Sequence, residues 1–76
     1  MNVKYEDVLD VLINSGVSAD VEGLAHDASL KDAGVDSLDI SNFFLCLEEK
    51  FEIEIADEDI DLLDTIDAIV SYIKKL

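Results

Sequence analysis

The chain has 76 residues, half of them apolar, which is enough for one domain with a single small core. Nineteen acidic and five basic residues give a net charge of −14, which argues against binding to nucleic acid or to anionic membrane surfaces. One cysteine excludes an internal disulfide, and the longest apolar run, residues 43–47, is too short for membrane insertion, so we expect a soluble, cytoplasmic monomer.

The first predicted helix covers residues 3–14, with Asn2 as its cap. Its apolar residues recur at helical spacing and form one face: Tyr5, Val8, Leu9, Leu12 and Ile13. Gly16 follows the last of them and is able to take the left-handed conformation that ends helices.

Residues 17–35 are predicted to form a long loop, broken by Gly23 and Gly34 and rich in Asp and Ser. About twenty irregular residues are unusual in so small a domain, which suggests a function or a short buried helical turn. Four apolar residues are expected to hold the loop against the core: Val21, Leu24, Leu30 and Val35.

The second helix is predicted over residues 37–50, with Asp36 as its N-cap. Its apolar face is formed at positions i, i+3, i+4, i+7 and i+11 by Ile40, Phe43, Phe44, Leu47 and Phe51.

Residues 51–55 alternate apolar and acidic side chains, but a single strand cannot form a sheet, so we expect an extended connector with Ile53 and Ile55 pointing inward. A short acidic helix follows over residues 57–62, and the last helix begins at a cap formed by Asp64 or Thr65. Its apolar face comprises Ile66, Ile69, Val70, Ile73 and Leu76. The prediction is an all-α four-helix bundle with three long helices and one short helix.

Ser37 is the most informative single residue. A serine just inside a helix start lies near unpaired backbone N–H groups and the positive end of the helix dipole, a place that suits a phosphate ester. A plain capping serine is the alternative, but Asp36 already offers a cap. No His or Lys neighbours Ser37 in the sequence to activate its hydroxyl, so we do not expect Ser37 to be a catalytic nucleophile of this chain and expect an outside enzyme to supply the base that modifies it.

Three other features favour simple structural roles. Cys46 lies beside the apolar face of its helix and is expected to be a small packing residue. His26 is expected to be an exposed loop residue. A calcium loop beginning at Ser18 would place Ser29 where a bidentate Glu is required, so we predict no dedicated metal site.

Residues 30–40, LKDAGVDSLDI, resemble the attachment segment of acyl carrier proteins, and LEEKFEIEI, DEDID and TIDAIVSYI extend the likeness over nearly the whole chain. The resemblance implies a single carrier domain over residues 1–76 that is not an enzyme. It also implies that Ser37 carries covalent 4′-phosphopantetheine, attached by a phosphopantetheinyl transferase. Asp36 would lie near the magnesium ion of that enzyme, and Leu38 would complete the attachment site. Acyl-loading and acyl-processing enzymes would use their own basic patches to dock on this chain. The residues they would contact are Leu38, Asp39, Leu45, Glu48 and Glu49.

The chain departs from fatty-acid-synthesis carriers at Ser41, Asn42 and the bulky pair Phe43–Phe44. The resemblance therefore implies a carrier of acyl thioesters in fatty acid or specialised lipid or polyketide-type biosynthesis. The alternatives are an aminoacyl or peptidyl carrier of a nonribosomal or cell-envelope pathway, and an unmodified acidic interaction module.

Overall fold

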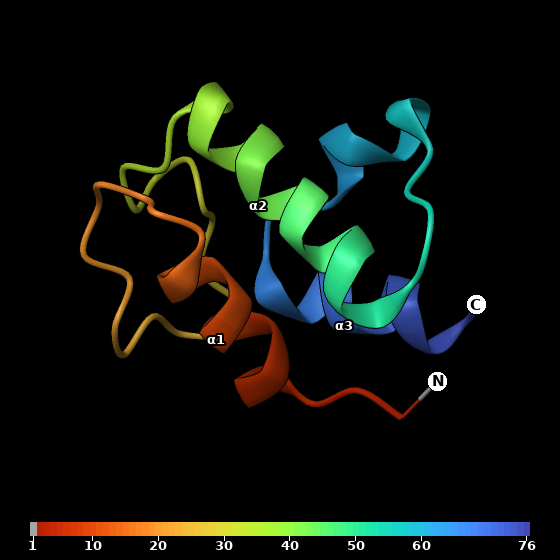
Figure 1. Ribbon diagram of the computed structural model, residues 1–76. Coiled ribbons are helices and arrows are strands. Elements are labelled where there is room, and N and C mark those ends of the chain that lie inside the picture. Colours follow the sequence, from red (N-terminus) through yellow and green to blue (C-terminus); the bar gives the residue numbers. More distant parts are fainter. Residues whose placement is uncertain (1) are drawn as a thin grey trace.

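The computed structural model describes residues 2–76, and within that range the chain forms helices and loops without a β-strand (Figure 1). Helices α2 and α3 both pack against α1. The predicted all-α bundle is confirmed, including the long loop between its first two helices. The elements in chain order are α1 (Tyr5–Asn14), α2 (Ser37–Phe51), the 3-10 helix η1 (Asp57–Leu62) and α3 (Ile66–Lys74).

Helix α1 begins two residues later than the sequence predicted, and Asn2 is not its cap. Val3 lies outside the helix and is buried in the core, and Lys4, which has an extended backbone, takes the cap position. The Lys4 backbone N–H donates to the Asp7 carboxylate at 3.1 Å, and the Lys4 carbonyl accepts from the Asp7 N–H at 3.1 Å. The predicted end is confirmed, because Gly16 follows the helix with a φ of +86°.

The apolar face predicted for α2 forms the centre of the core. Phe43, Phe44 and Leu47 are buried, whereas Ile40 and Phe51, nearer the helix ends, are half-buried. Both partner helices supply the opposite side of the core with Val8, Val11, Leu12, Ile66, Ile69 and Ile73. The prediction was wrong for Leu76, which lies beyond the end of α3 and is exposed to solvent.

The connector after α2 follows its predicted course. Helix α2 ends at Phe51, one residue beyond its predicted end, and the capping residue Glu52 has a left-handed φ of 55°. Beyond it the chain is irregular, with Ile53 half-buried and Ile55 buried. The Ile55 N–H donates to the Glu48 carboxylate at 2.8 Å, so an acidic side chain of α2 holds the connector in place.

The short helix η1 is fastened to α3. The Tyr72 hydroxyl donates to the Asp59 carboxylate at 3.0 Å, and Ile60 and Leu63 pack against the core. In Figure 1, η1 lies near the upper end of the bundle, close to α2. This placement makes η1 one wall of the hollow beside the start of α2 that is described below. Within residues 2–76, no helix is both long and apolar enough to cross a bilayer.

The charge leads to a prediction about stability. Five cations cannot neutralise nineteen carboxylates, and the only ion pair among residues 2–76 joins His26 to Asp67. Self-repulsion therefore opposes the compact state. We expect added sodium chloride or millimolar magnesium to raise the midpoint of thermal unfolding, measured by circular dichroism. An unchanged midpoint in both salts would show that repulsion does not limit stability.

Candidate functional site

The start of α2 presents an exposed serine. Asp36 has an extended backbone and its carboxylate accepts the Asp39 N–H at 2.9 Å, which confirms Asp36 as the N-cap. Ser37 is the first helical residue and is exposed, as are Asp36 and Leu38, whose side chain is 75% exposed. The three residues predicted for the site therefore lie together at one helix tip, and the Ser37 hydroxyl is not needed as the cap.

A tight turn delivers the chain to this helix tip. Three backbone hydrogen bonds close residues 29–35: Ala33 N–H to the Ser29 carbonyl at 3.0 Å, Gly34 N–H to Lys31 at 3.1 Å, and Val35 N–H to Leu30 at 3.1 Å. Gly34 has a φ of +95°, a conformation that favours glycine. Of the four residues expected to pin the loop, three are buried and Leu24 is half-buried.

Asp64 anchors the turn, and the sequence did not reveal this contact. Its carboxylate accepts a hydrogen bond from the Ser29 hydroxyl and another from the Lys31 N–H at 3.3 Å, while its carbonyl accepts the Leu30 N–H at 2.7 Å. Thr65, not Asp64, caps α3 by accepting the Ala68 N–H at 3.0 Å. The start of α3 thus holds the loop that leads to Ser37.

The middle of the same loop is fastened by His26. As expected its side chain is exposed, but its Nδ1 lies 2.8 Å from an Asp67 carboxylate oxygen, and its carbonyl accepts the Asp67 N–H at 2.9 Å. The Tyr5 ring meets the imidazole edge-on, with centroids 5.7 Å apart, and the Tyr5 hydroxyl donates to the Leu24 carbonyl. The hydrogen bond to Asp67, followed by the negative charges of Asp67 and Asp27, raises the pKa of His26 above the ordinary 6.5.

This contact predicts a pH dependence. A histidine whose folded pKa is raised stabilises the fold fully below its unfolded pKa, and the contribution is lost as pH rises through the folded value. We therefore expect His26→Gln to reduce stability more at about pH 6 than at about pH 8.5. Urea unfolding of both proteins at both pH values measures the difference. A variant with the same deficit at both pH values would contradict the prediction, and Asp67→Asn should reproduce the His26→Gln pattern.

A hollow of about 210 Å³ lies beside Ser37. Apolar side chains of Ile40, Ile60 and Leu63 form part of its wall, and polar side chains form the rest. One of the polar residues is Lys31, so a lysine lines the hollow beside Ser37 even though none neighbours Ser37 in the sequence. The complete lining is Lys31, Ser37, Ile40, Ser41, Ile60, Asp61, Leu63 and Asp64. The turn described above brings Lys31 to this place.

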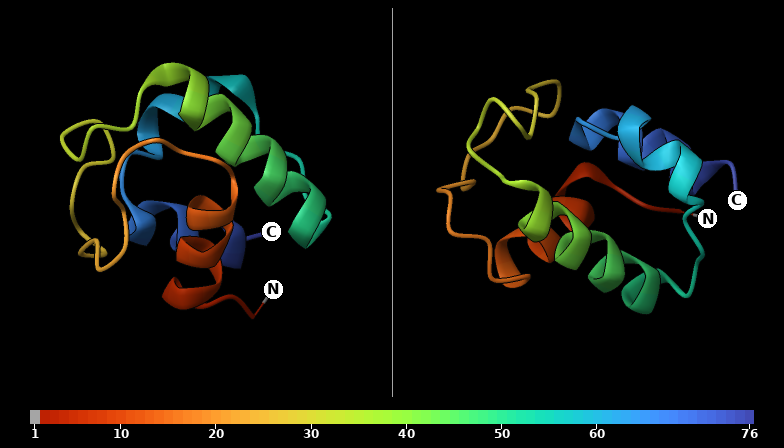
Figure 2. Two further views of the ribbon diagram at one scale, coloured as in Figure 1. Left: turned by 60° about the vertical axis from the view of Figure 1, so that its left-hand side comes forward. Right: turned by 90° about the horizontal axis from the view of Figure 1, so that it is seen from above.

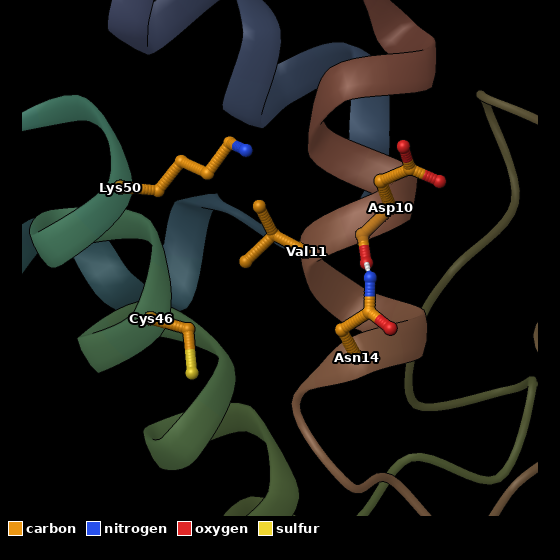
Figure 3. A pocket seen from close by; sticks show the side chains of 5 residues that line it. All are labelled: Asp10, Val11, Asn14, Cys46 and Lys50. Carbon is orange, nitrogen blue, oxygen red and sulfur yellow. Dashed lines mark hydrogen bonds between the residues drawn. The ribbon is translucent and has the colours of Figure 1, made fainter.

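A second hollow, of about 260 Å³, lies between α1 and α2 (Figure 3). Half-buried Cys46 and exposed Lys50 line it from α2, opposite Val11 and Asn14 of α1. The Asn14 amide donates to the Asp10 carbonyl at 2.9 Å. Cys46 lies nine residues along α2 from Ser37, about 14 Å. This hollow is therefore separate from the Ser37 tip. Within residues 2–76, no three His, Cys, Asp or Glu side chains converge in a metal-binding group.

The five residues expected to contact partners differ in how far they are available. Leu38 and Leu45, 58% exposed, project from α2, and Glu49 is exposed. Glu48 and Asp39 are half-buried, and the Glu48 carboxylate already accepts the Ile55 N–H. The exposed subset is therefore Leu38, Leu45 and Glu49.

Comparison with known proteins identifies the family of this chain. Residues 8–73 match the family model described as a phosphopantetheine attachment site. The chain is 40% identical over 73 residues to the acyl carrier protein of Campylobacter concisus (strain 13826) and 38% identical over 73 residues to that of Campylobacter jejuni (strain RM1221). Each alignment covers 95% of this chain and 94% of the relative.

A more distant match is the acyl carrier protein of Bdellovibrio bacteriovorus (strain HD100), 36% identical over 69 residues, covering 90% of this chain and 87% of the relative. The family match spans most of the described helices, from within α1 to within α3. The chain therefore belongs to the acyl carrier protein family, whose members hold 4′-phosphopantetheine covalently and act as carriers rather than as enzymes.

Proposed function

We propose that Ser37 carries the 4′-phosphopantetheine arm and that the chain presents acyl groups, held on this arm as thioesters, to partner enzymes. One observation carries the assignment: the exposed Ser37 hydroxyl lies at the first turn of α2, while Asp36 already caps the helix. The Asp39 N–H of that turn is bonded to Asp36, whereas the backbone N–H groups of Ser37 and Leu38 have no partner within the helix and favour a phosphate. The residues at this tip therefore fit the phosphodiester end of the arm.

Attachment needs an outside catalyst. Lys31 is the one cationic side chain lining the hollow beside Ser37, and an ammonium group donates hydrogen bonds but cannot accept the hydroxyl proton. His26 is engaged with Asp67. A phosphopantetheinyl transferase would take the hydroxyl proton as the Ser37 oxygen forms its bond to phosphorus, with the nucleotide part of coenzyme A leaving. Asp36 is exposed beside the hydroxyl, where it is available to a magnesium ion held by that enzyme.

The bound arm would supply a terminal thiol for the acyl group, and the chain's own part is to tether and present it. A tether raises the effective concentration of the intermediate at each successive active site. Partner contacts then have to be weak enough to release the carrier. An acidic surface, with Leu38 and Leu45 as apolar contacts and Glu49 as a free charge, suits brief docking to basic patches on acyl-loading and acyl-processing enzymes.

Residues 1–76 are proposed to act as one cytoplasmic carrier domain, which the single core and the match over residues 8–73 support. Fatty acid synthesis or a specialised lipid or polyketide-type pathway is the proposed setting. Ser41 and Asn42, both exposed on α2, favour the specialised choice, because partners would meet uncharged side chains there. An aminoacyl or peptidyl cargo is the alternative.

The test is incubation with coenzyme A and a broad-specificity phosphopantetheinyl transferase, followed by intact-mass and peptide mass spectrometry. The expected result is a gain of one phosphopantetheine group on the peptide that contains Ser37. Ser41, one turn further along α2 and also exposed, is the internal comparison and should stay unmodified. An unchanged mass with several transferases would reject the carrier function in favour of an unmodified interaction module.

A further inference from the structure

Lys31 occupies a special place among the five basic residues. It lines the hollow beside Ser37, whereas Lys50 lines the separate hollow near the other end of α2. The only ion pair among residues 2–76 is that of His26 with Asp67, so no described carboxylate lies within 4 Å of the Lys31 ammonium group. The hollow beside Ser37 is therefore lined by one cation that forms no ion pair with a described carboxylate.

The backbone at Lys31 is fixed from two sides. Its N–H donates to the Asp64 carboxylate at 3.3 Å, and its carbonyl accepts the Gly34 N–H at 3.1 Å. The next residue inward, Leu30, is fully buried. A lysine in such a turn has a fixed backbone position and a flexible four-carbon side chain, which lets its ammonium group reach a nearby anion.

Attachment of the arm at Ser37 would place another negative charge among Asp36, Asp61 and Asp64. Resting on the function proposed above, we propose that Lys31 is a positioning residue that binds the phosphodiester of the Ser37-linked arm, together with the first backbone N–H groups of α2. The interaction offsets the charge of the phosphodiester and directs the first part of the arm along the hollow. A lysine suits this role because it binds phosphate as a point charge without requiring a fixed bidentate geometry.

The competing explanation is that Lys31 only offsets the carboxylates of Asp61 and Asp64. The two explanations differ in one respect: general compensation acts equally before and after the arm is attached, whereas phosphodiester binding acts only after attachment. Comparison of the unmodified and modified forms of each variant therefore separates them.

The experiment uses the full chain, Lys31→Gln and the control Lys50→Gln, each prepared with and without the arm. Lys50→Gln removes the same charge from the same acidic protein, but about 20 Å along α2 from Ser37. Mass spectrometry first confirms loading of all three proteins. Urea unfolding at low ionic strength then gives the folding equilibrium constant of each form.

For Lys31→Gln, the folding constant of the loaded form is expected to fall about 1.5- to 5-fold more than that of the unloaded form, the range of exposed ion pairs. This difference should vanish at about 1 M salt, and Lys50→Gln should show none. Nuclear Overhauser contacts between the Lys31 side-chain methylenes and the arm methylene next to phosphorus are expected in the loaded wild-type chain.

Equal effects of Lys31→Gln on both forms, or absence of these contacts, would overturn the proposal for Lys31 while leaving Ser37 as the attachment residue. Failure of all three proteins to gain mass would instead overturn the function proposed for Ser37, and the role of Lys31 with it.

Discussion

Replacing Ser37 by alanine should abolish attachment of the arm completely while leaving the fold nearly unchanged. The hydroxyl is the group to which phosphorus would bond, so its removal leaves no acceptor at the start of α2. Stability should change by less than about 1 kcal/mol, because Ser37 is exposed and Asp36 provides the cap. Intact mass after transferase treatment measures the first effect, and urea unfolding measures the second.

Ser41→Ala is the matched control. Ser41 is a second exposed serine on α2 and lines the same hollow, so its replacement removes the same atoms one turn away. It should load as the wild-type chain does. Normal loading of Ser37→Ala would show that another residue accepts the arm, and peptide mapping would locate it. Loss of loading in both variants would point to disturbed recognition by the transferase rather than to a missing acceptor.

The helices and the presented hydroxyl follow from local patterns. Spacing of the apolar residues predicts each helix, because burial of one face is the main source of stability for short helices. The N-cap of α2 could be predicted because a cap depends on neighbours within three residues, as the 2.9 Å bond between Asp36 and Asp39 shows. The start of α1 was predicted wrongly because Val3 is buried in the core ahead of the helix, and local spacing does not reveal such a tertiary contact.

The surroundings of Ser37 depend on contacts between distant residues. Asp64 is 35 residues from Ser29, and Asp67 is 41 residues from His26, so no local spacing links the partners. Lys31 is closer to Ser37 in sequence, yet its place in the lining of the same hollow depends on the turn that Asp64 anchors. The sequence does show a single lysine, Lys31, ahead of the acidic helix, which could have drawn attention to it. The sequence alone does not indicate on which side of the turn this lysine lies.

These distant contacts also suggest why the long loop can be irregular without being loose. It is joined to α1 through Tyr5, to the start of α3 through Asp64, and to the first turn of α3 through Asp67. Figure 2 shows the loop on the side of the bundle away from the chain ends, leading into the start of α2. Ser37 thus lies at the start of a helix whose preceding loop is fixed at several points. A flexible arm attached to it would supply the motion that a carrier needs.

Phe43→Ala should have the largest effect on stability. The Phe43 side chain is completely buried at the middle of α2, and its ring lies 5.6 Å from that of Phe44. Truncation of a buried phenylalanine costs about 3–5 kcal/mol, whereas a domain of this length is stable by about 4–11 kcal/mol in total. We therefore expect a large fall in the urea midpoint measured by circular dichroism, with Phe43→Leu retaining part of the lost stability by filling part of the cavity.

Leu62→Ala is the control for this substitution, since Leu62 is a large apolar residue that is 72% exposed and its truncation should change stability by less than about 0.5 kcal/mol. The stability of Phe43→Ala also tests which role the bulky pair Phe43–Phe44 has. If both rings simply pack the core, the cavity left by Phe43→Ala destabilises the unloaded protein by about 3–5 kcal/mol. If Phe43→Ala instead leaves stability unchanged, the space around the ring is adaptable, and the pair would be better explained as filling space that an acyl chain would otherwise enter.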